Sequence, residues 1–104
     1  MDHRLKKNKQ FTYLYKKGKR SFTKHLTLYT MTSKFKDYKI GYSVSKRIGK
    51  ANVRNKIKRR MKEIVRTNGF AQNYNNYVLV AKEGIEEVSF LELSNEIREI
   101  FNKW

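Results

Sequence analysis

The chain has 104 residues, with 25 Lys and Arg against 9 Asp and Glu, which gives a formal net charge of +16. The absence of cysteine excludes disulfides, thiolate metal sites and cysteine nucleophiles. The longest clearly apolar run, residues 77–81, is far shorter than the roughly 20 residues of a membrane-spanning helix. We expect one domain over residues 1–104, and a cytoplasmic protein, since the basic N-terminus has no apolar stretch typical of a signal peptide.

The first predicted element is a helix that begins at Asn8 and ends near Gly18. Asn8 is a good helix cap, and Phe11, Leu14 and Tyr15 recur at spacings of three and four residues. An aromatic pair at this spacing is commonly part of a core, which is one interpretation of Phe11 and Tyr15.

Two strands are predicted next, at residues 25–31 and 39–45, because both segments alternate with period two. In the first strand Leu26 and Leu28 should face the core, and Tyr29 should lie on the opposite face with His25 and Thr27. In the second strand one face is apolar and the other is a low, hydroxyl-lined surface. The two sets are Ile40, Tyr42 and Val44, and Gly41, Ser43 and Ser45.

The second half of the chain predicts a helix at residues 52–66, a short buried strand at 77–81 and a last helix that begins at Ser89. The middle helix has an apolar stripe of Val53, Ile57, Met61, Ile64 and Val65, and Asn68 and Gly69 should end it. Ser89 and Glu92 fit a capping box. The last helix carries Leu93, Ile97, Ile100, Phe101 and Trp104 on one face. The order α-β-β-α-β-α indicates an α+β protein, a small sandwich with helices packed on a mixed sheet.

Positive charge is concentrated in residues 1–66, which carry 22 Lys and Arg against 3 acids, whereas residues 67–104 carry 3 against 6. Opposite the apolar stripe of the middle helix, Arg54, Lys58 and Lys62 repeat every four residues. Like charges at this spacing repel one another, so a sequence selected only for folding would dilute them with Glu. A solvated basic surface is the plain alternative, but the pattern favours binding to the phosphates of a nucleic acid.

Residues 41–59 read Gly-Tyr-Ser-Val-Ser-Lys-Arg-Ile-Gly-Lys-Ala-Asn-Val-Arg-Asn-Lys-Ile-Lys-Arg. This run resembles the signature of the bacterial ribonuclease P protein component, and residues 6–11, 28–30 and 77–82 are also similar to that family. The resemblance implies the protein subunit of an RNA-based endonuclease that removes the 5′ leader of precursor tRNA. It also implies a left-handed βαβ crossover, whereas periodicity alone would favour the usual right-handed one.

In that family the RNA subunit performs the hydrolysis with Mg²⁺, which we expect to be held mainly by RNA and substrate. The resemblance therefore implies no catalytic residue, no metal ligand and no protein partner for this chain, but two RNA partners, the RNA subunit and precursor tRNA. The residues implied in binding the RNA subunit are Lys50, Arg54, Asn55, Lys58, Arg59 and Lys62. Those implied in binding the leader are Phe11, Tyr15, Tyr29, Ser43, Ser45, Lys46 and Arg47.

Three other functions are alternatives for a chain of this composition. A structural RNA-binding protein, such as a ribosomal protein, shares the size and the charge. A helix-turn-helix DNA-binding protein is disfavoured, because strands flank the basic helix and no short helix precedes it. A self-sufficient nuclease would need a catalytic cluster, yet His3 and His25 are the only histidines and the few acids show no metal-ligand spacing.

Overall fold

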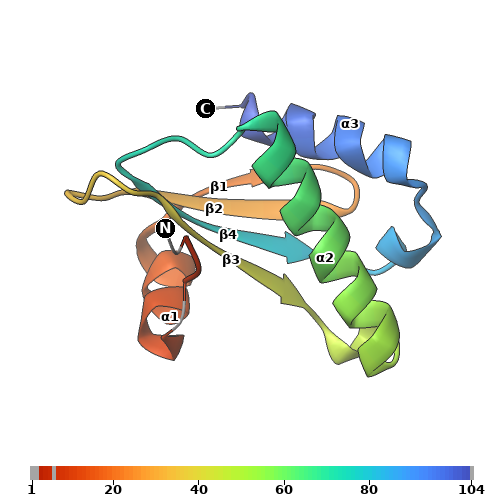
Figure 1. Ribbon diagram of the computed structural model, residues 1–104. Helices are drawn as coiled ribbons and strands as arrows, with labels where there is room; N and C mark the ends of the chain where they lie inside the picture. Colours follow the sequence, from red (N-terminus) through yellow and green to blue (C-terminus); the bar gives the residue numbers. More distant parts are fainter. Residues whose placement is uncertain (1–2, 6, 104) are drawn as a thin grey trace.

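The computed structural model describes residues 3–5 and 7–103 and contains all six predicted elements (Figure 1). The helices are α1 (Asn8–Lys17), α2 (Ala51–Asn68) and α3 (Phe90–Phe101), with short 3₁₀ turns η1 (Lys46–Ile48) and η2 (Ile85–Glu87). The strands are β1 (Lys19–Phe22), β2 (Leu26–Thr32), β3 (Lys39–Val44) and β4 (Asn75–Ala81). Trp104, predicted on the apolar face of the last helix, lies outside the described residues.

Strand β1 was not predicted. Only Ser21 of its four residues is buried, so the segment has no apolar alternation from which a strand could be recognised. Its conformation comes from antiparallel pairing with β2, in which Ser21 lies opposite Leu28. The order of elements is therefore α-β-β-β-α-β-α.

The four strands form one mixed sheet in the order β1-β2-β4-β3. Strand β4 pairs antiparallel with β2 and parallel with β3, and α2 connects β3 to β4. The predicted mixed sheet is thus confirmed, whereas the left-handed crossover implied by the resemblance stays a prediction.

Helices cover both faces of the sheet, with α2 and α3 on one side and α1 on the other (Figure 1). The larger core lies under α2 and α3 and includes Leu28, Leu79, Met61 and Ile97, all of them fully buried. The smaller one lies under α1, where Leu14 and Leu5 pack around Val78. Because both faces of β4 are covered, its apolar run does not alternate.

The residues that end the helices agree in part with those predicted from the sequence. Gly69 ends α2 in the left-handed conformation with φ of 62°, as predicted. The prediction that Asn8 caps α1 is wrong: Lys7 holds that position, and its N–H donates to the side chain of Gln10. At α3 the Ser89 hydroxyl oxygen accepts from Glu92 N–H, but the Glu92 carboxylate accepts from that same hydroxyl group rather than from the backbone of Ser89.

Candidate nucleic-acid interface

The solvent face of α2 carries most of the predicted cationic residues. Lys58, Arg59 and Lys62 are exposed, as are Lys50 and Asn55. The apolar stripe of the same helix is turned to the core, where Ile57, Met61, Ile64 and Val65 are buried. The helix therefore presents a dense row of positive charge to solvent while its other face holds it on the sheet.

Arg54 departs from the expectation of a solvent-facing side chain. It is half-buried, and its Nε donates to the Gly49 carbonyl oxygen at 3.2 Å. Part of its role is therefore to hold the loop before α2. Its charge still lies at the start of the cationic row, one turn before Lys58.

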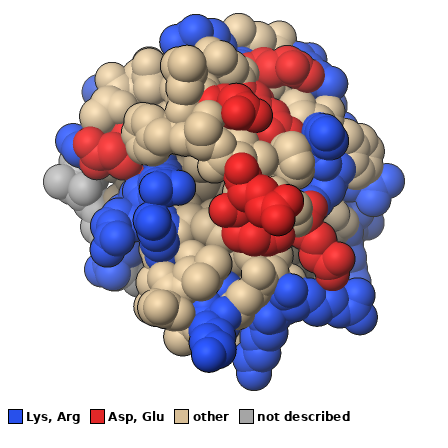
Figure 2. All heavy atoms as spheres, turned by 90° about the vertical axis from the view of Figure 1, so that its right-hand side faces the viewer, with Lys and Arg blue, Asp and Glu red and all other residues tan. Residues whose placement is uncertain are grey.

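Most acidic residues are separated from this row, and Glu63, which bonds Arg66, is the one acid on α2. The six glutamates of the second half of the chain lie between residues 83 and 99, in and around η2 and α3. Figure 2 shows most of the acidic side chains near the centre and upper right of this face, with Lys and Arg around its left, lower and right edges. A polyanion that approaches the α2 face therefore meets mostly positive charge.

A groove of about 370 Å³ lies where β3, α2, α1 and the N-terminal segment meet. Lys58, Arg59 and Lys62 line it from α2, Tyr42 from β3 and Phe11 from α1. Phe11 was predicted for the leader and the three cations for the RNA subunit. The structure thus brings members of both predicted sets to one groove, which the separate sequence motifs did not indicate.

Phe11 sits directly on the backbone of β3. A Cβ atom built on Gly41 would lie 2.6 Å from Cε1 of the Phe11 ring and closer still to its Cζ. Only glycine leaves room for the ring here. The low surface predicted for this strand face is therefore occupied by one half-buried aromatic side chain, which is both a packing residue and a wall of the groove.

The other two predicted aromatics form a separate pair on the α1 side of the sheet. The rings of Tyr15 and Tyr29 meet edge to face, with centroids 4.9 Å apart. Tyr15 is 41% exposed and Tyr29 is half-buried. Since Val78 of β4 lies beside both Tyr29 and Gly41 in the sheet, this pair and Phe11 flank the same row of residues.

The remaining predicted leader residues follow one another at the end of β3. Ser43 is half-buried in the strand, and Ser45, Lys46 and Arg47 are exposed. The Ser45 hydroxyl oxygen accepts from Arg47 N–H at 3.2 Å and so fixes the start of η1. Lys46 and Arg47 are therefore held on a short rigid turn between β3 and α2.

The N-terminal segment is a part of the site that the sequence did not indicate. Ile40 N–H donates to the His3 carbonyl oxygen at 2.8 Å, and Leu5 N–H donates to the Ile40 carbonyl oxygen at 3.2 Å. Leu5 is buried under α1. A single leucine among basic residues has no periodicity, so only the pairing with β3 reveals that this segment forms a wall of the groove.

Within residues 3–5 and 7–103, no three or more His, Asp or Glu side chains are grouped so that they could hold a metal ion. No helix in the same part of the chain is long and apolar enough to cross a membrane.

Comparison with known proteins gives a consistent result. The Ribonuclease P family matches residues 1–104. The ribonuclease P protein component of Clostridium kluyveri is 36% identical over 104 residues, which cover 97% of this chain and 93% of that protein. That of Bacillus velezensis is 31% identical over 102 residues, covering 97% and 88%.

Solved structures agree with these relatives. The RNase P protein of Staphylococcus aureus superposes with a TM-score of 0.92 at 28% identity, covering 99% of this chain and 95% of that one. The RNase P protein of Thermotoga maritima, at 24% identity and a TM-score of 0.88, covers 97% and 96% and has the same fold. The chain therefore belongs to the ribonuclease P family, as a protein component of the enzyme that processes the 5′ leaders of tRNA.

Proposed function

We propose that the protein binds the RNA subunit of ribonuclease P through the cationic face of α2 and the loop before it, and binds the single-stranded leader of precursor tRNA. The observation that carries this proposal is the groove in which Lys58, Arg59 and Lys62 face the ring of Phe11. Single-stranded RNA is held by base stacking on aromatic side chains together with a basic groove that follows its backbone.

The further leader contacts in the proposal are Tyr15, Tyr29 and the residues from Ser43 to Arg47 at the end of β3. Tyr29 offers a partly open ring on the outer face of the sheet, and Lys46 and Arg47 offer phosphate contacts at the end of β3. The six residues of the RNA-subunit set lie on α2 and its preceding loop, where Lys50 and Asn55 are exposed. A net charge of +16 would reduce the repulsion between two RNA molecules that must lie side by side.

The proposal places the hydrolysis in the RNA subunit. His3 is stacked on Tyr38, and His25 is bonded to Glu96, so each histidine has a packing partner. The proposal assigns no step to a metal on this chain. We infer that Mg²⁺ is held mainly by RNA and substrate, and that the protein works in the cytoplasm.

Reconstitution tests the proposal. The purified protein is added to a bacterial ribonuclease P RNA, and cleavage of precursor tRNA is measured at low Mg²⁺ concentration. We expect the protein to raise cleavage strongly, and the complex to bind precursor tRNA more tightly than mature tRNA. A structural RNA-binding protein would show no such preference, and cleavage by rigorously RNA-free protein would overturn the assignment of hydrolysis to RNA.

A further inference from the structure

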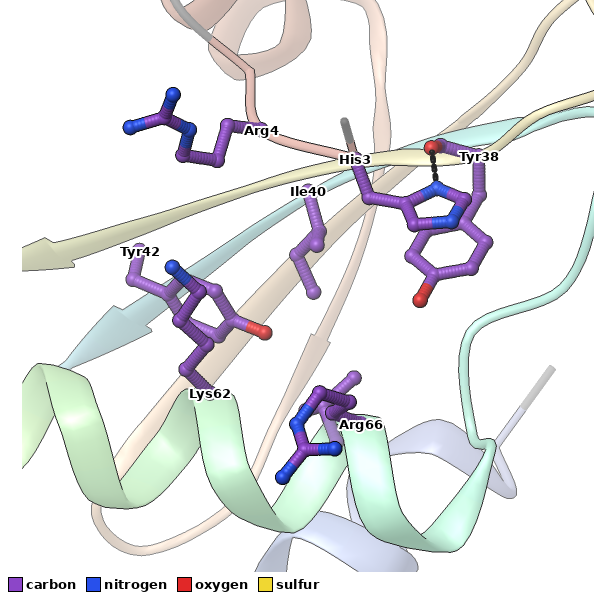
Figure 3. A pocket seen from close by; sticks show the side chains of 8 residues that line it. His3, Arg4, Tyr38, Ile40, Tyr42, Lys62 and Arg66 are labelled. Carbon is purple, nitrogen blue, oxygen red and sulfur yellow. Dashed lines mark hydrogen bonds between the residues drawn. The ribbon is translucent and has the colours of Figure 1, made fainter. Parts of the chain in front are cut away.

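A second pocket, of about 220 Å³, lies between the start of β3 and the C-terminal half of α2 (Figure 3). Tyr38, Ile40 and Tyr42 reach into it from the β3 side, and Val65 and Arg66 line it from α2. Of the residues that line it, Lys62 alone belongs to the sets predicted for the RNA subunit or the leader. The floor is apolar, since Ile40 and Val65 are buried core residues.

One wall of the pocket is a preformed aromatic stack. The rings of His3 and Tyr38 lie 3.9 Å apart and within 7° of parallel. His3 is held on both sides, because its Nδ1 bonds the Tyr38 carbonyl oxygen at 2.7 Å and its own carbonyl accepts from Ile40 N–H. The stack is thus ordered before any ligand binds, which lowers the entropic cost of binding a planar ring.

The polar groups of the pocket are suited to the edge of a nucleobase. Figure 3 shows the hydroxyls of Tyr38 and Tyr42 directed into the space above α2. Burial, and then the neighbouring Tyr38, raise the pKa of Tyr42, so its hydroxyl stays protonated and can donate. Arg66, which bonds Glu63 at 2.8 Å, and the exposed Lys62 place positive charge at the mouth, where a phosphate would lie.

The pocket is continuous with the groove described above. Arg4, Ile40, Tyr42 and Lys62 line both, so one path follows β3 from Phe11 to the His3–Tyr38 stack. Tyr38 directly precedes β3 and is three residues from Gly41 in the sequence. Gly41 and the Phe11 ring lie on the α1 side of the sheet, whereas Tyr38, Ile40 and Tyr42 pack on the α2 side, so the path passes around the edge of β3. Two bases bound at the two places would belong to near neighbours in a single strand.

We propose that this pocket seats one unstacked base of the precursor tRNA leader, beyond the nucleotide that contacts Phe11. The inference rests on the proposed function. The base would pack between the His3–Tyr38 stack and the Tyr42 ring, its edge would meet the two hydroxyls, and its phosphate would lie toward Lys62. The apolar floor suits a base better than a phosphate alone, and the Lys62 ammonium group at the mouth suits the phosphate attached to that base.

The first experiment uses the reconstituted holoenzyme and precursor tRNAs whose leaders grow one nucleotide at a time. We expect affinity to rise at one leader length beyond those affected by Tyr29→Ala, and Tyr38→Ala to remove that rise, with a loss of about 5- to 150-fold. Tyr13→Ala is the matched control, because Tyr13 is an exposed α1 tyrosine that lines neither the groove nor the pocket. A 2-aminopurine at that leader position should lose its stacking-dependent quenching in Tyr38→Ala.

A second variant keeps the test decisive if Tyr38→Ala lowers the melting temperature. Tyr42→Phe removes one hydroxyl and retains the ring that packs on the core. We expect an unchanged melting temperature and a leader-length profile with the rise still present. The dependence of affinity on which of the four bases occupies that leader position should become weaker by several-fold.

The outcomes separate the pocket from the wider function. If Tyr29→Ala changes the leader-length profile, while Tyr38→Ala keeps the rise and Tyr42→Phe keeps the full dependence on base identity, the proposed function stands and the pocket assignment is wrong. If both pocket variants weaken binding of the RNA subunit alone, without precursor tRNA, the base comes from the RNA subunit and the leader assignment is overturned. If no variant alters leader binding, the proposed leader site itself fails.

Discussion

Replacing Gly41 by alanine should displace Phe11 from the sheet and weaken leader binding with it. The added Cβ would lie 2.6 Å from Cε1 of the ring, where carbon atoms normally sit 3.5–4.0 Å apart. It would also lie 3.3 Å from Cβ of Leu5, so the ring cannot move toward the N-terminal segment freely. The ring must therefore move by about 1 Å, outward into the groove.

We expect Gly41→Ala to lower the free energy of unfolding by about 1–2 kcal/mol, toward the low end for an overpacked site, because the ring stands at the edge of its cluster. Denaturant unfolding measures this cost. Precursor tRNA with a leader and mature tRNA, titrated against the reconstituted holoenzyme, show whether the binding loss is confined to the leader.

A double-mutant cycle with Phe11→Ala tests the reason for the effect. Once the ring is absent, the methyl group at position 41 has nothing to displace, so Gly41→Ala should cost little in the Phe11→Ala background. The stability loss of the double mutant should therefore be smaller than the sum of the two single losses by about 1 kcal/mol or more. Strict additivity, or a Gly41→Ala protein as stable as the parent, would refute the contact between Phe11 and Gly41.

Three further expectations concern other parts of the site and the fold. Tyr29→Ala should cost about 1–3 kcal/mol in binding precursor tRNA with a long leader and nothing with a minimal one; equal losses for all RNAs, together with a lowered melting temperature, would mean that the ring is only a packing residue. Lys58→Ala with Arg59→Ala should reduce the slope of log affinity for the RNA subunit against log salt by roughly 0.7–0.9 per lost phosphate contact, and an unchanged slope would show that this face does not touch RNA. Glu96→Gln should lower the free energy of unfolding at neutral pH by about 1–3 kcal/mol. Burial opposes the charge of Glu96, but hydrogen bonds from the His25 N–H and ring outweigh this effect and lower the pKa of Glu96. The parent should therefore lose its advantage over the variant as the pH falls below about 4 and the carboxyl group protonates, and a stability difference that stays constant down to pH 2 would contradict this.

Local pattern was sufficient for the elements whose residues alternate or repeat clearly. The stripe from Ile57 to Val65 predicted α2 because a helix with one apolar face must bury it, and the glycine at 69 ends it in the conformation glycine favours. The cationic row on the opposite face was predicted for the same geometric reason. Arg54 was the exception, since its bond to the Gly49 carbonyl depends on the conformation of the loop before the helix.

The features that tertiary structure alone decided are those in which distant segments meet. Strand β1 has no apolar alternation and becomes a strand because β2 pairs with it. The N-terminal residues His3 and Leu5 bond to Ile40, more than 30 positions away, and nothing in their own sequence specifies that partner. By itself the sequence determined which helix is cationic and which elements carry the aromatic side chains, because charge and periodicity are local properties. That Phe11 faces Lys58 across one groove, and that this groove leads to the His3–Tyr38 stack, was decided by the packing of α1, α2 and the N-terminal segment around the edge of β3, because contacts between distant residues follow from the fold rather than from spacing.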